Sequence, residues 1–218
     1  MIDTRLILIE GLPGAGKTTT TCYLRDVLQR RGVACRPYLE EDQPHPIDCA
    51  DFEIKGLPEK MVPLWENFVT QAQREPTITI IESRLWQNTA LFMYMSECSM
   101  EEITCFARKV AQVLLPLAPV LVYLDQEDTE SALSRLYAFR GEAWMNETIG
   151  WTSQYPWFQS RGLHDFGGWV RFFTEWRQVA GQLYDDWPVR KLKILNPHTN
   201  WASSYQQLRT FLQVAHEE

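Results

Sequence analysis

Short apolar runs alternate along this chain with longer segments whose apolar residues recur every three or four positions. The short runs are rich in aliphatic and β-branched residues, as in strands buried on both faces of a parallel sheet, and they cover 6–9, 33–39, 77–81, 120–124 and 189–195. The longer segments have the spacing of amphipathic helices and cover 18–31, 57–74, 88–117 in two pieces, 128–142, 168–187 and 201–214. Strands that alternate with helices predict an α/β fold, namely a doubly wound parallel sheet of five strands with helices on both faces.

Local signals support two of these helix boundaries. Gly32 follows the first helix, where glycine commonly ends helices, and Ser99 with Glu102 forms a capping box that starts the second piece of 88–117. Residues 143–166 are rich in Trp, Tyr, Gly and Gln and show no clear period, so we expect a mobile lid over about 128–166. No internal repeat or linker divides the 218 residues, and a single domain is therefore expected.

Composition narrows the class of protein. Hydrophobic residues make up 45% of the chain and charged residues 22%, as in an ordinary soluble domain. The formal charge of −7, without any run of five Lys or Arg residues, predicts that nucleic acid is not a partner. No secretory signal and no long apolar stretch is found, so we expect no contact with a membrane. The cysteines are five in number and form no C-x-x-C pair, which favours reduced thiols and a cytoplasmic location.

The strongest chemical signal follows the first predicted strand. Gly11, Gly16, Lys17 and Thr18 match the pattern G-x-x-x-x-G-K-[ST]. Glycines at 11, 14 and 16 allow successive backbone N–H groups to turn inward around phosphate oxygens, and the following helix adds its positive dipole end. Lys17 would reach the β and γ phosphates, and the Thr18 hydroxyl would ligate Mg²⁺. The pattern therefore predicts a triphosphate-binding loop rather than an ordinary glycine-rich turn before a helix.

Acidic residues follow the second predicted strand. Glu40, Glu41 and Asp42 should face the phosphate loop, because ligands of open α/β sheets bind outside the carboxyl ends of the strands. One of them is a candidate general base for an acceptor hydroxyl, and an acidic surface turn is the alternative. His45 follows between two prolines and is either a substrate contact or a surface residue.

The third predicted strand ends in a second polar group. Glu82 stands where an acid can orient Mg²⁺ or its water, and Arg84 has the geometry to hold a phosphate or a substrate oxygen; a structural ion pair is the alternative. Gln87 and Asn88 follow at the expected start of a helix, where they either contact an acceptor or cap the helix. Trp65, on the apolar face of 57–74, belongs either to the core or to an apolar wall of an acceptor pocket.

The segment after the fourth predicted strand carries two arginines, Arg135 and Arg140, on one helix. If this helix covers the phosphates, the two guanidinium groups would stabilise charge during phosphoryl transfer. A solvated basic helix face is the alternative.

Taken in order, these motifs resemble the thymidylate kinase and deoxynucleoside kinase group of P-loop enzymes. The resemblance rests on residues 10–19, on Glu40, on Glu82 with Arg84, and on the strand 120–124 that leads to Arg135 and Arg140. It implies the fold of P-loop nucleoside triphosphate hydrolases, ATP and Mg²⁺ as cofactors, and a nucleotide-binding loop of Gly11, Pro13, Gly14, Ala15, Gly16, Lys17, Thr18 and Thr19.

The same resemblance implies roles for the remaining residues. Lys17, Glu40, Arg84, Arg135 and Arg140 would be catalytic, and Thr18 and Glu82 would hold the metal. Acceptor contacts would come from Glu40, Glu41, His45, Trp65, Arg84, Gln87 and Asn88.

Two departures from the group's pattern concern the acceptor side. Ser83 separates the acid from the arginine, which leaves the direction of Arg84 open, and Glu41 replaces the expected proline, so either Glu40 or Glu41 is the base. A full signature for a thymine site is missing. We therefore expect an ATP- and Mg²⁺-dependent kinase of a nucleoside, a nucleotide or another small hydroxylated metabolite, with a homodimer as a candidate assembly.

Two other functions fit the loop as well. A P-loop ATPase or nucleotide-dependent switch would use Asp125, at the end of its apolar strand, as the acid on the magnesium side, with water as acceptor. A module that binds the nucleotide without transferring phosphate is the third possibility.

Overall fold

A single parallel sheet organises the computed structural model, which describes residues 3–48 and 56–214. Its five strands lie in the order β2-β3-β1-β4-β5, and every neighbouring pair is parallel. The strands are β1 Leu6–Gly11, β2 Cys35–Tyr38, β3 Ile78–Glu82, β4 Val120–Asp125 and β5 Arg190–Leu195. The predicted doubly wound, five-stranded sheet is confirmed, with strand limits that shift by up to two residues.

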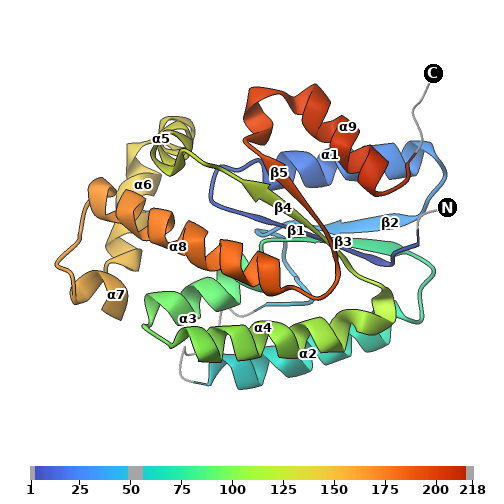
Figure 1. The fold of residues 1–218 in the computed structure, drawn as a ribbon, viewed down its shortest axis with the longest axis horizontal. Helices are drawn as coiled ribbons and strands as arrows, with labels where there is room; N and C mark the ends of the chain where they lie inside the picture. The colour runs from blue at the N-terminus through green and yellow to red at the C-terminus, as the bar shows by residue number, and fades with distance from the viewer. Residues whose placement is uncertain (1–2, 49–55, 215–218) are drawn as a thin grey trace.

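Helices cover both faces of this sheet (Figure 1). On one face lie α1 Lys17–Arg30 and α9 Trp201–Phe211, whose buried residues share a core cluster with Ile7 and Ile9 of β1. On the other face lie α2 Leu57–Ala72, α3 Leu91–Met95, α4 Met100–Leu114 and α8 Phe166–Asp186. Two short 3-10 turns, Leu115–Leu117 and Pro197–Thr199, follow α4 and β5.

β1 occupies the centre of the sheet because every one of its residues can be buried. Its side chains alternate between the two faces, so Leu6 and Leu8 enter one core cluster while Ile7 and Ile9 enter the other. Parallel partners on both sides, β3 and β4, satisfy its backbone. The phosphate loop that follows Gly11 is consequently held at the middle of the carboxyl edge.

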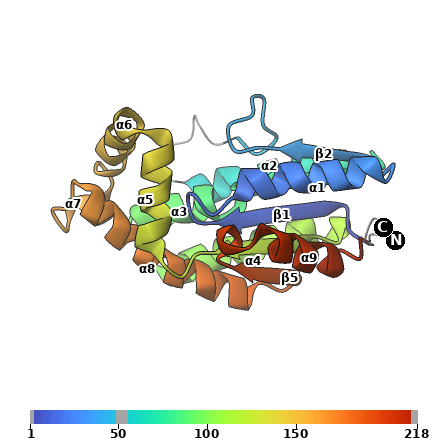
Figure 2. The same cartoon turned by 90° about the horizontal axis from the view of Figure 1, so that it is seen from above.

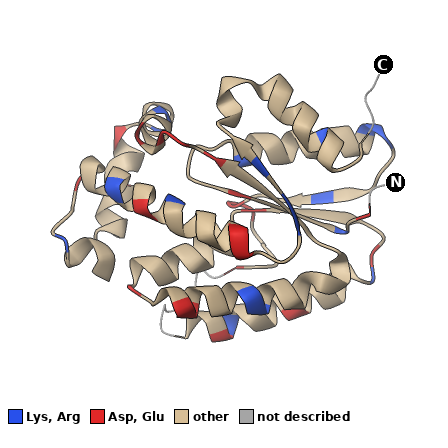
Figure 3. Ribbon diagram, in the orientation of Figure 1, with Lys and Arg blue, Asp and Glu red and all other residues tan. Residues whose placement is uncertain are grey.

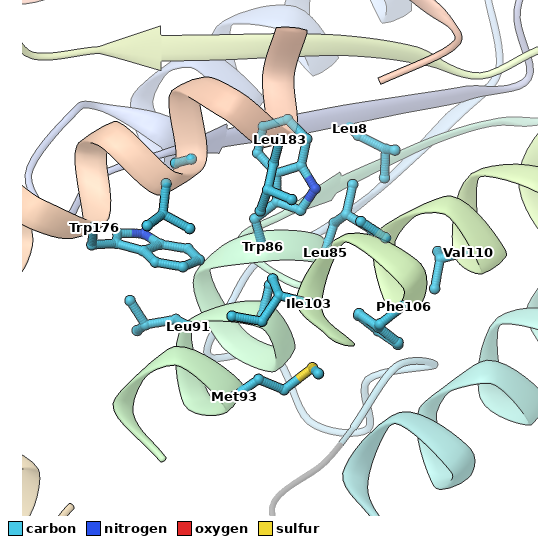
Figure 4. Packing of buried hydrophobic residues seen from close by; sticks show 14 of the residues in the cluster. Leu8, Leu85, Trp86, Leu91, Met93, Ile103, Phe106, Val110, Trp176 and Leu183 are labelled. Atoms are coloured by element: carbon cyan, nitrogen blue, oxygen red, sulfur yellow. The ribbon is translucent and has the colours of Figure 1, made fainter. Parts of the chain in front are cut away.

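The larger core cluster is rich in aromatic residues. Trp86 is buried beside Leu85 and Leu183, with Ile103 and Phe106 of α4 closing the space below (Figure 4). The Trp86 ring meets Trp187 edge to face, with ring centroids 5.7 Å apart. This packing fixes the segment that leaves the end of β3.

The segment that leaves β3 is a π-helix, η1 Leu85–Ala90, which runs directly into α3. The pattern of apolar residues predicted a helix only from residue 88 onward. The capping box of α4 is present as expected, because the Ser99 side chain accepts from Glu102 N–H and the Glu102 carboxylate accepts from Ser99 N–H.

Three helices gather beyond the carboxyl edge of the sheet: α5 Thr129–Arg140, α6 Glu142–Thr152 and α7 Pro156–Gln159 (Figure 2). Residues 143–166, for which the sequence showed no clear period, are therefore largely helical. The sequence did not reveal these helices because α6 lacks a single apolar stripe at helical spacing.

Helices α4 and α8 both carry charged residues of both signs (Figure 3). Within the described ranges, no helix is both long enough and apolar enough to cross a membrane. Among those residues Cys22, Cys35, Cys98 and Cys105 are free thiols, whereas Cys49 falls outside them.

Candidate functional site

The loop between β1 and α1 depends on glycines for its shape. Gly14 (φ 75°) and Gly16 (φ 91°) adopt the left-handed region that other residues rarely enter. Gly16 also stands against the Trp201 ring, because a Cβ added there would lie 2.3 Å from Trp201 Cη2. The loop is therefore packed from outside by the first residue of α9.

Lys17 points back into its own loop. Its Nζ donates to the carbonyl oxygens of Gly11 at 3.1 Å and Leu12 at 3.0 Å. Burial lowers the pKa of Lys17, and the nearby carboxylates of Glu40, Glu10 and Glu82 oppose this shift. A phosphate oxygen would offer this buried ammonium a full negative charge in place of two carbonyl dipoles.

Thr18 and Glu82, the two predicted metal ligands, are in direct contact. The Thr18 hydroxyl donates to Glu82 Oε1 at 2.8 Å, and the same oxygen accepts the N–H of Glu40 at 3.2 Å. Glu82 Oε2 is buried and has no hydrogen-bond partner, and burial raises the pKa of this carboxyl group.

This pair fits Mg²⁺, which usually takes one or two protein oxygens and completes its shell with water and phosphate oxygens. The described residues contain no group of three or more His, Cys, Asp or Glu side chains able to hold a metal on their own. A magnesium ion at this loop would therefore depend on the bound nucleotide for most of its ligands.

Ser83 turns the chain between Glu82 and Arg84. Its φ of 61° is left-handed, and its N–H donates to the Ile9 carbonyl at 3.1 Å. Arg84 is consequently directed to the same place as Glu82, since its Nη2 donates to the Glu40 carbonyl. Glu82 and Arg84 thus bind the N–H and the C=O of residue 40 and fix the position of its backbone.

The two candidate bases differ in their surroundings. Glu41 is exposed, with 78% of its side chain open to solvent, and its Oε1 accepts from Arg140 at 3.1 Å. Glu40 is half-buried and its backbone is clamped. Both line the cavity described next.

A cavity of about 700 Å³ joins the phosphate loop to helices α3, α5, α6 and α8. Of the predicted site residues it is lined by Pro13, Gly14, Gly16, Lys17, Thr18, Thr19, Glu40, Glu41, Gln87, Asn88, Arg135 and Arg140. Gly11, Ala15, Glu82 and Arg84 lie behind this lining and are buried. Residues that are 126 positions apart in the sequence, Thr18 and Trp144, therefore line the same cavity.

Trp65 and His45 are not part of the lining. Trp65 is completely buried in the core and meets Phe68 edge to face, so of its two interpretations the structure favours the core residue. His45 is buried beside Tyr38, and its Nδ1 accepts the N–H of Ile47 at 3.0 Å. Burial and the nearby Arg84 cation lower the pKa of His45 to about 4, so the imidazole is neutral at pH 7. It is neither a surface residue nor a residue that lines the cavity.

Glu10 is a buried residue for which the sequence motif predicted no separate role. Its Oε1 accepts the N–H of Leu85 at 2.9 Å and its Oε2 accepts the N–H of Gln87 at 3.1 Å. Burial raises the pKa of Glu10 to about 7 although these bonds and the Lys17 charge oppose the shift. Glu10 thereby anchors the start of η1, the helix that presents Gln87 and Asn88 to the cavity.

The aromatic residues of the cavity are those that sequence reasoning missed. Phe92 of α3, Trp144 and Trp151 of α6, and Trp169 and Phe173 of α8 all line it. The available signal was the high aromatic content of 143–166 and of 168–187, and it could not say which rings would face the same cavity.

Beyond β4, two polar groups occupy different positions. Arg135 Nη2 donates to Gln126 Oε1 at 3.3 Å and lies at the cavity. Asp125 is instead bound by Arg177, whose Nε and Nη2 donate to the two carboxylate oxygens at 2.6 and 2.9 Å. Asp125 therefore has neither oxygen free, and it does not line the cavity.

Solved structures resemble this architecture, whereas no family model and no curated protein sequence matches the chain. One is the YorR protein from Bacillus subtilis in complex with phosphorylated GDP, with 12% identity, a TM-score of 0.51, and coverage of 97% of this chain and 99% of that chain. Another is deoxyadenosine kinase from M. mycoides with the products dCMP and a flexible dCDP, with 16% identity, a TM-score of 0.51, and coverage of 94% and 99%. Together with the parallel five-stranded sheet, these similarities show that the chain has the fold of the P-loop nucleoside kinases.

Proposed function

We propose that the protein is a kinase that transfers a phosphoryl group from ATP to a hydroxyl group of a nucleoside, a nucleotide or another small hydroxylated metabolite. The single observation that carries this proposal is that Lys17 of the phosphate loop, Glu40 at the end of β2 and Arg135 of α5 line one cavity. Phosphoryl transfer requires these three kinds of group: a loop for the donor, an acid for the acceptor and cations for the transition state.

Each group then has a defined task. Lys17 exchanges its loop carbonyls for the β and γ phosphates, and the loop N–H groups hold the same oxygens. Thr18 and Glu82 would hold Mg²⁺, and the ion would neutralise phosphate charge. Arg135 and Arg140 reach the transferring group from the lid segment 128–166.

Glu40 is the proposed base, because hydrogen bonds to Glu82 and Arg84 fix its backbone at the cavity. Glu82 and Arg84 keep the backbone of residue 40 in place, so its carboxylate is presented to the cavity from a fixed point. A base held in this way removes the proton of an acceptor hydroxyl as the oxygen attacks phosphorus. Arg84 is in this arrangement a positioning residue.

The similar structures support a nucleotide as the donor. One of these proteins was solved with phosphorylated GDP and the other with dCMP and dCDP. The alternative of an ATPase or switch with Asp125 on the magnesium side has less support, because both oxygens of Asp125 are bound to Arg177.

The test is phosphoryl transfer from [γ-³²P]ATP, with Mg²⁺, to a panel of nucleosides, nucleoside monophosphates and other alcohols. We expect a labelled product with at least one acceptor and its loss in Lys17→Ala, with an unchanged circular dichroism spectrum. Hydrolysis at the same rate with and without every acceptor, or full transfer by the variant, would contradict the proposal.

A further inference from the structure

We propose that the acceptor is an uncharged alcohol with a flat apolar body, which binds between the aromatic rings of α3, α6 and α8, and that it does not already carry a phosphate. This inference rests on the proposed function and narrows it from three acceptor classes to one. It is carried by two independent properties of the cavity, the arrangement of its rings and the distribution of its charges.

Five rings line this part of the cavity and are here called the aromatic wall: Phe92, Trp144, Trp151, Trp169 and Phe173. They form two contacting groups. Phe92 meets Trp151 edge to face with centroids 5.8 Å apart. Trp169 meets Phe173 in the same way at 4.8 Å and Trp144 at 6.4 Å. Such edge-to-face contacts are a favoured arrangement of aromatic side chains.

Part of this wall is exposed to solvent. Trp151 is 45% exposed although a tryptophan side chain is among the most favourable to bury. Large exposed aromatic surface inside a concave site marks the place where an apolar ligand surface is buried. A flat ring stacked or wedged against these rings would remove that surface from water.

The charges of the cavity lie elsewhere. Its charged lining residues are Lys17, Glu40, Glu41, Arg135 and Arg140, which belong to the phosphate loop, the end of β2 and helix α5. The lining residues of α3, α6 and α8 are all uncharged: Leu91, Phe92, Met95, Trp144, Thr148, Trp151, Thr152, Trp169 and Phe173. The acceptor end of the described cavity therefore has no cation of its own.

Among the cations that line the cavity, Arg140 contacts the aromatic wall, and it already has two partners. Its guanidinium lies over the Trp144 ring, 5.4 Å from the centroid, and pairs with Glu41. Glu40 adds a second carboxylate to the same region. A phosphate on the acceptor would approach two carboxylates and an apolar wall, and desolvating an anion without a dedicated cation is costly.

The polar groups that remain suit a neutral ligand. Thr148 and Thr152 supply hydroxyls, and Gln87 presents an amide whose buried Oε1 has no partner. These groups can form hydrogen bonds with a heterocycle or a hydroxyl without requiring a charge. Orientation would come from the amide and hydroxyls, and affinity from the rings.

The test compares 2′-deoxyadenosine, 2′-deoxyguanosine, 2′-deoxycytidine and thymidine with their 5′-monophosphates, by calorimetry with a non-hydrolysable ATP analogue and by transfer from ATP. We expect at least one nucleoside to bind about 100-fold more tightly than its own monophosphate. Equal or tighter binding of the monophosphates, or no binding by any nucleoside, would overturn the inference. Nucleoside binding without transfer would uphold the inference and contradict the proposed function.

Two variants sharpen the result. Trp151→Ala removes a partly exposed ring and should weaken nucleoside binding by about tenfold, whereas the matched control Leu115→Ala, 55% exposed on another part of the surface, should leave it unchanged. Thr148→Arg adds a cation to the uncharged end and should shift the preference toward monophosphates by at least about tenfold. An unchanged preference in Thr148→Arg, with the fold intact, would contradict the proposed location of the acceptor.

Discussion

The Thr18 hydroxyl donates to Glu82 Oε1 at 2.8 Å, and this bond joins the start of α1 to the end of β3. Its partner oxygen, Oε2, is buried without a hydrogen bond. The two side chains are thus brought together before any nucleotide binds, so little reorganisation is needed to admit a cation between them and the phosphates.

Changing either side chain should raise the Mg²⁺ requirement. We expect Thr18→Val and Glu82→Gln each to increase the Mg²⁺ concentration at half-maximal transfer by about tenfold or more. The first variant removes the hydroxyl and the second removes the carboxylate charge, and neither changes the side-chain volume much. Magnesium titrations at saturating ATP measure this directly. Thr20→Val is the matched control on the same helix, since the buried Thr20 hydroxyl does not line the cavity and has no hydrogen-bond partner. An equal effect in all three variants would argue against a specific site.

The clamp on residue 40 predicts which acid is the base. Glu40→Gln should lower kcat by about 100-fold or more, the usual range for a lost general base. Glu41→Gln removes only an exposed ion pair with Arg140 and should change kcat by less than about fivefold. The variants are compared in single-turnover transfer. A larger loss in Glu41→Gln than in Glu40→Gln would reverse the assignment.

Glu10 predicts a pH dependence of stability. Its pKa is raised by burial to about 7, above the ordinary value of 4.5, so folding takes up a proton between these pH values. The free energy of unfolding should therefore decrease as the pH rises from 4.5 to 7 and then level off, by about 3 kcal/mol for this group.

The Glu10→Gln variant has no ionisable group at residue 10, so it should lack this part of the pH dependence of stability. Urea unfolding of both proteins at pH 5 and pH 8 isolates the contribution of Glu10, because the contributions of the other titrating groups cancel in the difference. The wild type should lose more free energy of unfolding between the two pH values than the variant does. Parallel pH profiles would show that Glu10 titrates normally.

Changes to the Asp125–Arg177 pair should lower the stability of the protein without abolishing its activity. Asp125 is 5% exposed, so Arg177→Leu would leave a buried carboxylate unpaired and should lower the free energy of unfolding by about 2 kcal/mol. Transfer activity below the unfolding temperature should persist. Asp125→Asn should likewise leave the dependence of turnover on Mg²⁺ concentration unchanged. Loss of magnesium-dependent turnover in this variant, with an intact fold, would support the ATPase alternative.

The parts of the site that follow from local sequence were predictable. Gly11, Gly16 and Lys17 lie within one loop whose geometry depends on its own residues, and the acids follow strands whose parallel arrangement places their ends together. The alternation of strands with helices was predictable for the same reason, because each strand is identified by its own apolar run.

The rest depended on contacts between distant segments. Ser83 was expected to leave Arg84 in an undefined direction, and only the left-handed turn with its bond to Ile9 brings that side chain to Glu40. The aromatic wall combines three helices whose rings meet only after folding, and no spacing within 143–166 announces it. Trp65 lies on an apolar helix face, and such a face suits a core residue as well as the wall of a pocket. Only the packing of α2 against α4 shows that the Trp65 side chain belongs to the core.

The contact between Gly16 and Trp201 ties together two residues far apart in the chain. The indole occupies the volume that a Cβ at position 16 would need, so a side chain there would meet both a disallowed φ and the ring. A smaller residue at 201 would make room at 16, but the left-handed φ of residue 16 would still favour glycine. In natural variants of this sequence, position 201 can therefore change alone, whereas position 16 should remain glycine.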